Sequence, residues 1–344
     1  MKKDSITLNG EEVNLAAAQL KLNNDLPEWE RHIFQFLCEW WNNSTDVLVN
    51  TSGSTGTPKT IKRSKNKMRI SAQMTGEFFN FKAQQKALLC LPANFIAGKM
   101  MLVRAMEWNL DLDYIEPKID LQIPKTNYYF SAMIPAQVET CIHNLQKISN
   151  LLIGGAPVNS SLEKELTPLP THFYVSYGMT ETVSHVAIRN LQKENNQIYT
   201  ALNDVSFTTT AQDELIISAP RLLNTPITTT DVVSLINKSQ FKWVGRSDFM
   251  INSGGLKISP ESIERKLTSI IPSPFFIHKG ANEKWGEAPI LVIEGDEFST
   301  QELLKKIRTV LPKPEVPVSV KFSPLFTTTR NGKLNRIATF NSIK

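Results

Sequence analysis

The sequence predicts an α/β protein with a large layered N-terminal domain of mixed sheets and a small α+β domain at the C-terminus. Three observations predict this fold. Apolar runs of strand length alternate with helical patterns up to about Phe241. After the segment WVGRSDFMINSGG, short helices mix with strands, and 344 residues suit about two domains. We therefore expect one domain over residues 1–247 and a second over residues 248–344.

The individual elements follow from local patterns. Short apolar runs predict strands at residues 47–49, 87–91, 128–130, 151–153, 173–175, 215–217, 290–293 and 318–322. Apolar residues at helical spacing predict helices over residues 29–37, 68–78, 260–267 and 300–310. These elements interleave, as expected of layers that cover a sheet.

Composition excludes several classes of protein. The chain is 41% hydrophobic and 21% charged, without the roughly 18-residue apolar run of a membrane span or a secretory pattern at its start. Cys38, Cys90 and Cys141 lack CxxC spacing, which predicts buried thiols in a reducing cytoplasm instead of disulfides or a zinc site. The net charge of +5 suits anionic small substrates as well as nucleic acid.

One polar segment, VNTSGSTGTPKTIKRS at residues 49–64, follows the predicted strand and precedes a helix. Small residues allow backbone N–H groups to face a phosphate, and Lys59 adds a cation. Pro58 stands where a Walker A loop needs its second glycine, and the spacing G-x-x-G is no dinucleotide fingerprint. A solvated Ser/Thr linker is the alternative to a phosphate site.

Five motifs occur in the order found in adenylate-forming enzymes, which are the acyl- and aryl-CoA synthetases, peptide-synthetase adenylation domains and luciferases. They are TSGSTGTPKTI, YGMTET, TTTD, GRSDFMINSGGLKISPESIE and TTTRNGKLNR. The first resembles the phosphate loop and the last resembles the C-terminal motif with the catalytic lysine. Because the motifs extend over almost the whole chain, the sequence is identified as a member of this superfamily.

The resemblance implies a reaction in two halves. A carboxylate attacks the α-phosphate of ATP to give an acyl-adenylate and pyrophosphate, and a thiol, usually that of CoA, then displaces AMP. The first half brings two anions together, so the site must neutralise charge. The resemblance makes Lys333 and Thr180 contacts of the α-phosphate and Glu181 the ligand of Mg²⁺. Outside the family, Lys333 would be a solvated lysine and Glu181 an acid at a helix N-terminus.

The other expected nucleotide contacts also come from the resemblance. Phosphate, adenine and ribose would lie against Thr51, Ser52, Ser54, Thr55, Lys59, Gly154, Gly155, Ala156, Tyr177, Gly178, Asp231 and Arg246. Locally, Asp231 could equally be a turn or cap residue and Gly154–Gly155 a simple turn.

The second half of the reaction implies a moving C-terminal lid. By resemblance, Asp248 is the hinge, and Gly254 and Gly255 line a tunnel for the pantetheine arm of CoA. A hinge of this kind concentrates the change in a few backbone dihedral angles. An exposed linker residue is the alternative reading of Asp248.

The acid is the least determined substrate. Only about 50 residues precede the phosphate loop, and this compact form most resembles the o-succinylbenzoate–CoA ligases of menaquinone biosynthesis. The segment LPANFIAGKMMLVRAMEW matches the substrate-pocket helix, and the expected acid contacts are Phe95, Gly98, Lys99, Arg104 and Ser176. Arg104 and Lys99 are candidate counter-charges for a dianionic acid, since buried cations need partners. A protein salt bridge, for example from Lys99 to Glu107, is equally open.

Two positions depart from the family pattern, and several alternatives remain. Phe95 replaces a common histidine and Phe249 replaces a second acid after the hinge. The chain could be another aryl- or acyl-CoA synthetase, could load a carrier-protein thiol, or could bind nucleotide without catalysis. The basic segment 59–69 lacks the aromatic residues of nucleic-acid sites, and the five histidines lack metal or triad spacing. The oligomer is expected to be a monomer or homodimer.

Overall fold

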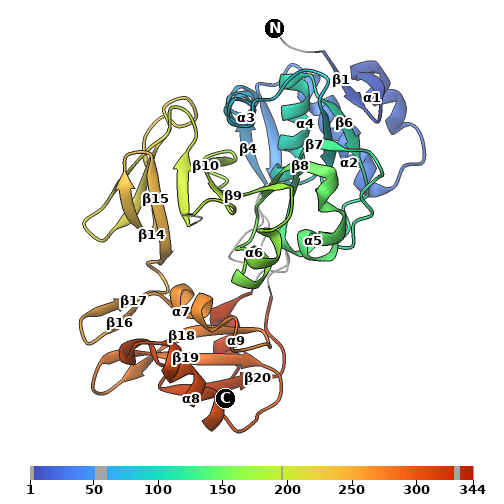
Figure 1. The fold of residues 1–344 in the computed structure, drawn as a ribbon. Coiled ribbons are helices and arrows are strands. Elements are labelled where there is room, and N and C mark those ends of the chain that lie inside the picture. Colours follow the sequence, from blue (N-terminus) through green and yellow to red (C-terminus); the bar gives the residue numbers. More distant parts are fainter. Residues whose placement is uncertain (1–3, 51–59, 195–196, 329–333, 344) are drawn as a thin grey trace.

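The computed structural model describes residues 4–50, 60–194, 197–328 and 334–343. These residues form two lobes, each built on its own sheet (Figure 1). The helices are α1 (Leu15–Leu22), α2 (Glu28–Trp41), α3 (Lys65–Phe79), α4 (Ile96–Trp108), α5 (Pro135–Thr140), α6 (Ser160–Leu166), α7 (Pro260–Leu267), α8 (Gln301–Val310) and α9 (Arg336–Ser342), with 3₁₀ turns η1 (Ile142–Lys147) and η2 (Lys313–Glu315). No helix in these ranges combines the length and apolar character needed to cross a bilayer.

The large lobe contains most of the strands. Among the described residues its sheet has 13 strands in the order β12-β13-β14-β15-β11-β10-β9-β8-β7-β5-β6-β1-β2. The strands are β1 (Ser5–Leu8), β2 (Glu11–Asn14), β5 (Lys86–Leu89), β6 (Asp111–Tyr114), β7 (Tyr128–Met133), β8 (Ile148–Ile153), β9 (His172–Gly178), β10 (His185–Asn190), β11 (Ile198–Ala201), β12 (Ser206–Thr209), β13 (Glu214–Ser218), β14 (Ile227–Asn237) and β15 (Gln240–Arg246). From β9 to β1 the neighbouring strands are parallel, and the strands beyond β9 pair antiparallel.

Alternate residues of the parallel strands enter two different cores. Leu89 and Leu152 pack in the core that includes residues of α2, α3 and α4. Leu88 and Ile153 pack in the core that includes residues of α5, η1 and α6. Since successive side chains of a strand point to opposite faces, the sheet is covered by helices on both sides. The fold class predicted from the sequence is therefore confirmed.

The segment around the predicted phosphate loop differs from the expectation. Residues 60–64 form a strand, β4 (Thr60–Ser64), which pairs antiparallel with β3 (Asp46–Asn50). Helix α3 begins only after β4, where the Ser64 side chain accepts a hydrogen bond from the Lys67 backbone N–H. The predicted helix is present, but the strand β4 was not predicted: residues 60–64 pair with β3 as a hairpin and are not part of a polar loop. Residues 51–59 lie outside the described part of the chain.

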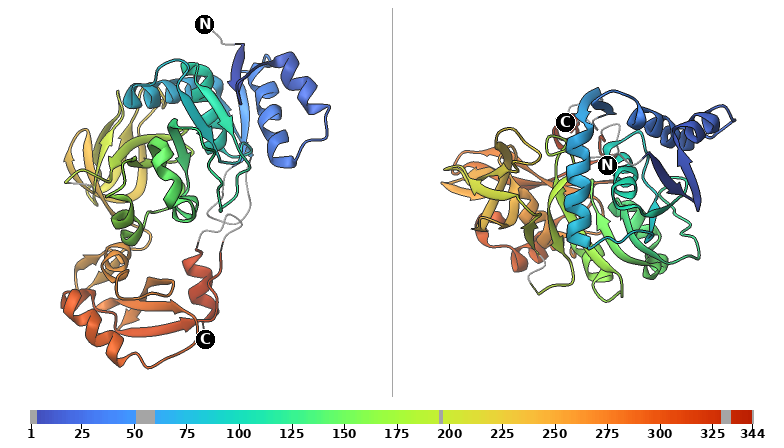
Figure 2. Two further views of the ribbon diagram at one scale, coloured as in Figure 1. Left: turned by 45° about the vertical axis from the view of Figure 1, so that its right-hand side comes forward. Right: turned by 90° about the horizontal axis from the view of Figure 1, so that it is seen from above.

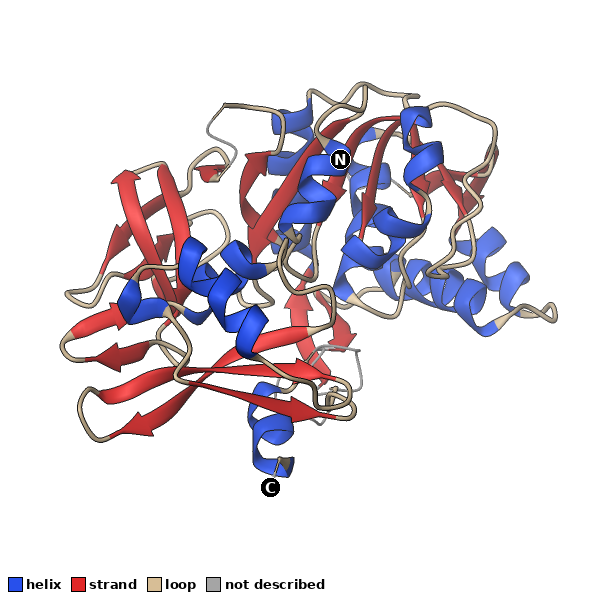
Figure 3. Ribbon diagram, turned by 60° about the horizontal axis from the view of Figure 1, so that its bottom comes forward, coloured by secondary structure: helices blue, strands red, loops and turns tan. Residues whose placement is uncertain are grey.

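The small lobe has a sheet in the order β17-β16-β19-β18, with β20 parallel to β19. Figure 3 shows that this lobe combines strands (red) with helices (blue). Its strands are β16 (Ile251–Ser253), β17 (Leu256–Ile258), β18 (Phe275–Asn282), β19 (Gly286–Glu294) and β20 (Ser319–Ser323). Helices α7 and α8 pack on this sheet through Ile263, Leu267 and Ile307. The predicted α+β texture is confirmed here.

A short connection joins the lobes, and the turned view of Figure 2 shows them one above the other. The last strand of the large sheet ends at Arg246 and β16 begins at Ile251. Ser259, the N-cap of α7, donates a hydrogen bond to the Val244 carbonyl over 2.7 Å. A Cβ on Gly245 would lie 2.7 Å from the Ser259 Oγ, so this close approach of α7 to β15 requires glycine.

The predicted elements of both lobes are present within a few residues of their expected bounds. The three cysteines are free thiols, with Cys90 and Cys141 buried and Cys38 half-buried. The division into functional units at residue 247/248 remains a prediction.

Candidate active site

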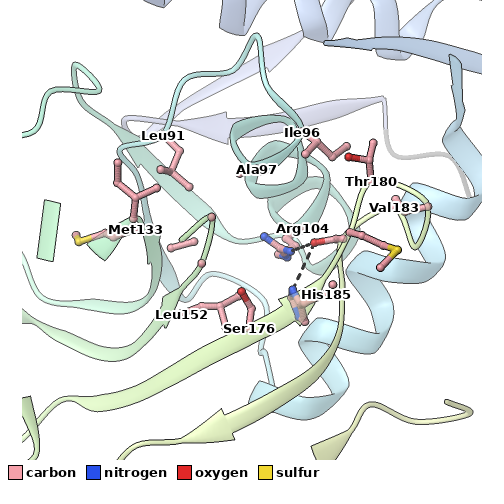
Figure 4. A pocket seen from close by; sticks show the side chains of 17 residues that line it. Leu91, Ile96, Ala97, Arg104, Met133, Leu152, Ser176, Thr180, Val183 and His185 are labelled. Carbon is pink, nitrogen blue, oxygen red and sulfur yellow. Dashed lines mark hydrogen bonds between the residues drawn. The ribbon is translucent and has the colours of Figure 1, made fainter. Parts of the chain in front are cut away.

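A pocket of about 270 Å³ opens where β7, β8 and β9 end and α4 begins (Figure 4). Ile96 and Arg104 of α4 line it, together with Ile134 after β7 and Gly154 after β8. The carboxyl ends of parallel strands are the usual place for ligands in such sheets, because loops diverge there. We call this cavity the α4 pocket.

A second pocket, of about 290 Å³, adjoins the first. The two share Gly155, Ser176 and Gly178 in their linings, so they meet at the end of β9. Tyr177 and Trp243 contribute aromatic walls to the second pocket. We call it the β9 pocket. Neighbouring cavities of this kind can hold two substrates against each other.

Asp231 lies behind the aromatic wall of the β9 pocket and is 9% exposed. Its Oδ2 accepts a hydrogen bond from the Tyr177 hydroxyl over 2.6 Å, and its Oδ1 accepts one from Trp243 Nε1 over 3.0 Å. Burial and the Asp231 carboxylate raise the pKa of Tyr177, so its hydroxyl stays a donor. The register of β14 and β15 pairs Asp231 with Arg246. The predicted ribose pair is therefore adjacent, although neither residue lines the pocket.

Arg104 is buried, 2% exposed, and lines the α4 pocket. Its Nε donates to Thr75 Oγ1 over 3.3 Å, its Nη2 to Ser184 Oγ over 3.2 Å and its Nη1 to Met101 Sδ over 3.6 Å. Within the described residues no carboxylate forms an ion pair with it. Burial lowers the pKa of Arg104 to about 10, which still leaves it charged at neutral pH.

The structure places Lys99 outside the α4 pocket. Its Nζ donates to the Leu48 carbonyl over 2.6 Å and lies 3.6 Å from Glu39 Oε2. Glu107 instead accepts a hydrogen bond from Gln73. Both readings of Lys99 made from the sequence, a substrate contact and a salt bridge to Glu107, therefore differ from its observed contacts. Sequence spacing within one helix could not reveal a partner on α2.

Phe95 and Gly98 also do not line the pocket, whereas Ile96 and Ala97 do. Phe95 is the N-cap residue of α4. A Cβ on Gly98 would lie 2.3 Å from the Pro92 carbonyl oxygen, so glycine allows the preceding turn to fold onto the helix. These two residues shape the start of α4, and the predicted contact of Phe95 and Gly98 with the acid has no support from the lining.

The loop from Met179 to Ser184 carries Thr180 into the α4 pocket. The Thr182 hydroxyl closes this loop by contacts with Met179 and Ser184, and Val183 takes an unusual φ of 70° for a β-branched residue. Glu181 is exposed and lies in a turn, which removes the reading of Glu181 as a helix N-terminal acid. It directly follows Thr180, which lines the α4 pocket.

Two predicted residues near the connection between the lobes form an ion pair. Arg246 Nη2 donates to Asp248 Oδ2 over 2.7 Å, and both side chains are partly exposed. Gly254 and Gly255 form the turn between β16 and β17 with φ of 56° and 86°. A Cβ on Gly254 would lie 2.6 Å from the ring of Trp285, so the ring packs directly on this turn.

The structure brings together most of the sequence-predicted nucleotide and acid residues that it describes. Those that line one or both pockets are Arg104, Gly154, Gly155, Ala156, Ser176, Tyr177, Gly178 and Thr180. The predicted residues Thr51, Ser52, Ser54, Thr55, Lys59 and Lys333 lie outside the described residues. No group of three or more His, Cys, Asp or Glu side chains in the described ranges is arranged to hold a metal.

Sequence reasoning missed four residues of the site. Thr75, Ser184 and His185 surround Arg104, and Trp243 binds Asp231. Ser184 and His185 are the second and third residues after the YGMTET motif, and this nearness to the motif was the available signal. Thr75 lies on another helix, 29 residues before Arg104, and no sequence pattern links the two.

The comparisons with known proteins bear on the family and the fold of the chain. The family model described as AMP-binding enzyme matches residues 14–204. A 2-succinylbenzoate–CoA ligase of Haemophilus influenzae is 24% identical over 73% of this chain, and the chain spans 60% of the length of that relative.

Two solved structures share the fold. An acyl-CoA synthetase (AMP-forming)/AMP-acid ligase II-like protein from Dyadobacter fermentans is 31% identical, with a TM-score of 0.65 over 96% of this chain and 99% of its own. An o-succinylbenzoate CoA synthetase from Bacillus subtilis, in complex with the acyl-adenylate intermediate, is 20% identical, with a TM-score of 0.75 over 86% of this chain and 69% of its own. Because the family model matches more than half of its residues, this chain belongs to the AMP-binding enzymes, the adenylate-forming family.

Proposed function

We propose that the protein is an ATP-dependent acid–CoA ligase that forms an acyl-adenylate, and that its acid is a small aryl dicarboxylate such as o-succinylbenzoate. The observation that carries the choice of acid is Arg104, a buried cation in the wall of the α4 pocket without a carboxylate partner among the described residues. A buried charge is costly unless an opposite charge meets it. The second carboxylate of the acid supplies that charge.

The adjoining pockets support the division of the substrates. The α4 pocket takes the acid and the β9 pocket takes the adenosine of ATP, with Tyr177 and Trp243 beside the base and Asp231 towards the ribose. At about 270 Å³ the α4 pocket suits a compact acid, since pockets for drug-sized ligands start near 300 Å³. The reacting carboxylate and the α-phosphate would meet near Ser176, which both pockets share.

The chain's own residues can perform the first half of the reaction. Thr180 in the wall of the α4 pocket offers a hydroxyl to the α-phosphate, and Lys333, which lies outside the described residues, is assigned the charge between carboxylate and phosphate. Glu181 is exposed beside Thr180 and fits one coordination position of Mg²⁺, with phosphate oxygens as other ligands. When bound, Mg²⁺ neutralises phosphate charge.

The second half would use the small lobe. We propose that residues 248–344 turn about Asp248 as a lid, which replaces the Lys333 segment at the site by the turn at Gly254 and Gly255. The short connection between Arg246 and Ile251 and the exposed Arg246–Asp248 pair support this boundary. The carrier-protein alternative differs only in the source of the thiol.

A panel of acids in ATP–pyrophosphate exchange tests the proposal, followed by release of AMP on addition of CoA. We expect exchange without CoA, with the highest kcat/KM for o-succinylbenzoate, and AMP release with CoA. Binding of ATP without exchange for any acid would favour the non-catalytic nucleotide-binding alternative. If exchange occurs but AMP is released only with a phosphopantetheinyl carrier protein, that protein is the thiol acceptor in place of CoA.

A further inference from the structure

The guanidinium of Arg104 is part of a closed ring of hydrogen-bonded side chains. Thr75 Oγ1 and Ser184 Oγ each accept a hydrogen bond from Arg104, over 3.3 and 3.2 Å. His185 contacts the same two hydroxyls, with Nε2 3.3 Å from Thr75 Oγ1 and Nδ1 3.4 Å from Ser184 Oγ. Figure 4 shows Arg104 and His185 close to each other in the wall of the pocket. The ring thus joins α3, α4 and the start of β10.

The other hydrogen bonds of Thr75 fix the position of the hydrogen on His185. The Thr75 hydroxyl donates to the Ser71 carbonyl over 2.9 Å, so Thr75 Oγ1 can only accept from its other neighbours. His185 Nε2 must therefore carry the hydrogen and donate it to Thr75. Nδ1 is then an acceptor for the Ser184 hydroxyl, whose oxygen in turn accepts from Arg104. A neutral imidazole with hydrogen on Nε2 satisfies every member of the ring.

A charged imidazole at His185 would not fit this arrangement. His185 is 5% exposed, and its burial and the nearby Arg104 charge lower its pKa well below 6.5. A second hydrogen on Nδ1 would also displace the hydroxyl hydrogen that Ser184 donates. Among the elements packed around His185, the charged group that lowers its pKa is Arg104 on α4. The four hydrogen-bonded side chains therefore hold one positive charge, which lies on Arg104.

Two N–H groups of Arg104 remain for a ligand. Of the five guanidinium hydrogens, Nε donates to Thr75, one hydrogen of Nη2 to Ser184 and one of Nη1 to Met101. One hydrogen on each terminal nitrogen has no partner among the described residues. Arg104, Ser184 and His185 all line the α4 pocket. Fixing the hydroxyls fixes the plane of the guanidinium, and with it the direction of these two donors.

We propose that His185 is a positioning residue for the second carboxylate of the acid: its neutral ring orients the hydroxyls of Thr75 and Ser184, which hold Arg104 in the plane that receives the carboxylate. This inference rests on the proposed function, because it assumes a dicarboxylic acid in the α4 pocket. It adds a determinant of acid specificity that acts through Arg104.

Substrate discrimination in ATP–pyrophosphate exchange tests this role. The two acids are o-succinylbenzoate and 4-oxo-4-phenylbutanoate, which lacks the ring carboxylate. In His185→Phe, which keeps a ring but removes both hydrogen-bonding atoms, we expect KM for the diacid to rise about tenfold with kcat within about threefold. KM for the monoacid should not change. His185→Gln, which retains a donor and an acceptor, should restore the diacid KM to within about threefold of wild type.

Thr75→Val provides a second, nearly isosteric variant should His185→Phe fold poorly. It removes one acceptor of Arg104 and should raise the diacid KM while sparing the monoacid. An equal loss with both acids, or equal behaviour of the Phe and Gln variants, would overturn the role of His185. Wild-type enzyme without exchange for either acid would instead contradict the proposed function.

A spectroscopic measurement tests the role of His185 independently of the proposed function, since it needs no substrate. In ¹⁵N-histidine-labelled protein, the His185 signals, assigned by their loss in His185→Gln, should show a neutral ring protonated at Nε2. They should stay so between pH 8 and pH 6. A ring protonated at Nδ1, or one that titrates near pH 6.5, would contradict the hydrogen-bond assignment whatever acid the enzyme uses.

Discussion

The ammonium group of Lys99 donates a hydrogen bond to the carbonyl oxygen of Leu48 over 2.6 Å, which ties α4 to the strand that precedes the phosphate-loop motif. Glu39 completes this contact, since its Oε1 accepts from the Leu48 N–H and its Oε2 faces Lys99. The charge of Lys99 therefore supports the hairpin of β3 and β4, whereas the charge of Arg104 lies in the wall of the α4 pocket.

Lys99→Met should lower the free energy of unfolding by about 1–3 kcal/mol, because it leaves the Leu48 carbonyl and Glu39 without their cation. KM for the acid should stay within about twofold of wild type, and Glu39→Gln should resemble it in denaturant unfolding. A tenfold rise in acid KM without loss of stability would show that Lys99 contacts the acid.

Asp231→Ala should raise KM for ATP at least tenfold, because hydrogen bonds to a charged group contribute about 1.5–3 kcal/mol and the ribose would lose two of them. Tyr177→Phe is the matched control. It removes a donor to Asp231 but leaves the carboxylate, so we expect a rise of less than about threefold. Unchanged ATP KM in Asp231→Ala, measured by pyrophosphate exchange, would exclude the ribose contact.

Gly178→Ala should disturb the loop that carries Thr180 and Ser184. A Cβ at this position would lie 2.3 Å from the Ser184 carbonyl oxygen, so the start of β10 would have to move. We expect a loss of about 1–3 kcal/mol of stability and a weaker preference for the diacid. Unfolding curves and the two-acid assay measure both effects, and a variant that matches wild type in each would show that the loop has room.

Lowering the pH should destabilise the protein through His185. Its folded pKa lies well below the value of 6.5 for an accessible histidine, so the unfolded chain binds the proton more readily. Stability is then complete above about pH 6.5 and falls at lower pH, by at most about 1.4 kcal/mol per pH unit. His278, whose pKa burial also lowers, contributes in the same direction.

Urea unfolding between pH 7.5 and pH 5.5 measures this dependence. His185→Gln should show a shallower fall than wild type, and His278→Gln should do so without a change in acid KM. Identical pH dependence in wild type and His185→Gln would mean that the ring is not buried in its neutral form.

Asp248→Pro should spare acyl-adenylate formation and slow the transfer to CoA, since it restricts a backbone angle that the proposed lid motion must change. Asp248→Ala is the control: it breaks only an exposed ion pair with Arg246, which contributes about 0–1 kcal/mol. Single-turnover rates of the two half-reactions decide the matter, and equal rates for Pro and Ala variants would place the hinge elsewhere.

The sequence allowed good predictions where local pattern determines the structure. The amphipathic helix at α2 and the apolar runs at β5, β7 and β8 occur as expected, because period and burial coincide there. The motif glycines lie at the ends of β8 and β9, where the pockets meet.

Predictions failed where a partner came from elsewhere in the chain. Residues 60–64 form a strand because β3 pairs with them, and the polar composition concealed that pairing. Lys99 and Arg104 share one helix and one residue class, yet Lys99 meets Glu39 and Arg104 meets Thr75 and Ser184. Only the packing of α2, α3 and β10 around α4 separates their roles.

The central claim is that Arg104 receives a second carboxylate of the acid, and one measurement tests it most directly. It is the ratio of kcat/KM for o-succinylbenzoate to that for 4-oxo-4-phenylbutanoate, by ATP–pyrophosphate exchange, in wild type and in Arg104→Met. We predict a ratio well above one in wild type that falls at least tenfold in the variant, mainly through KM for the diacid. A ratio that Arg104→Met leaves unchanged would contradict the account.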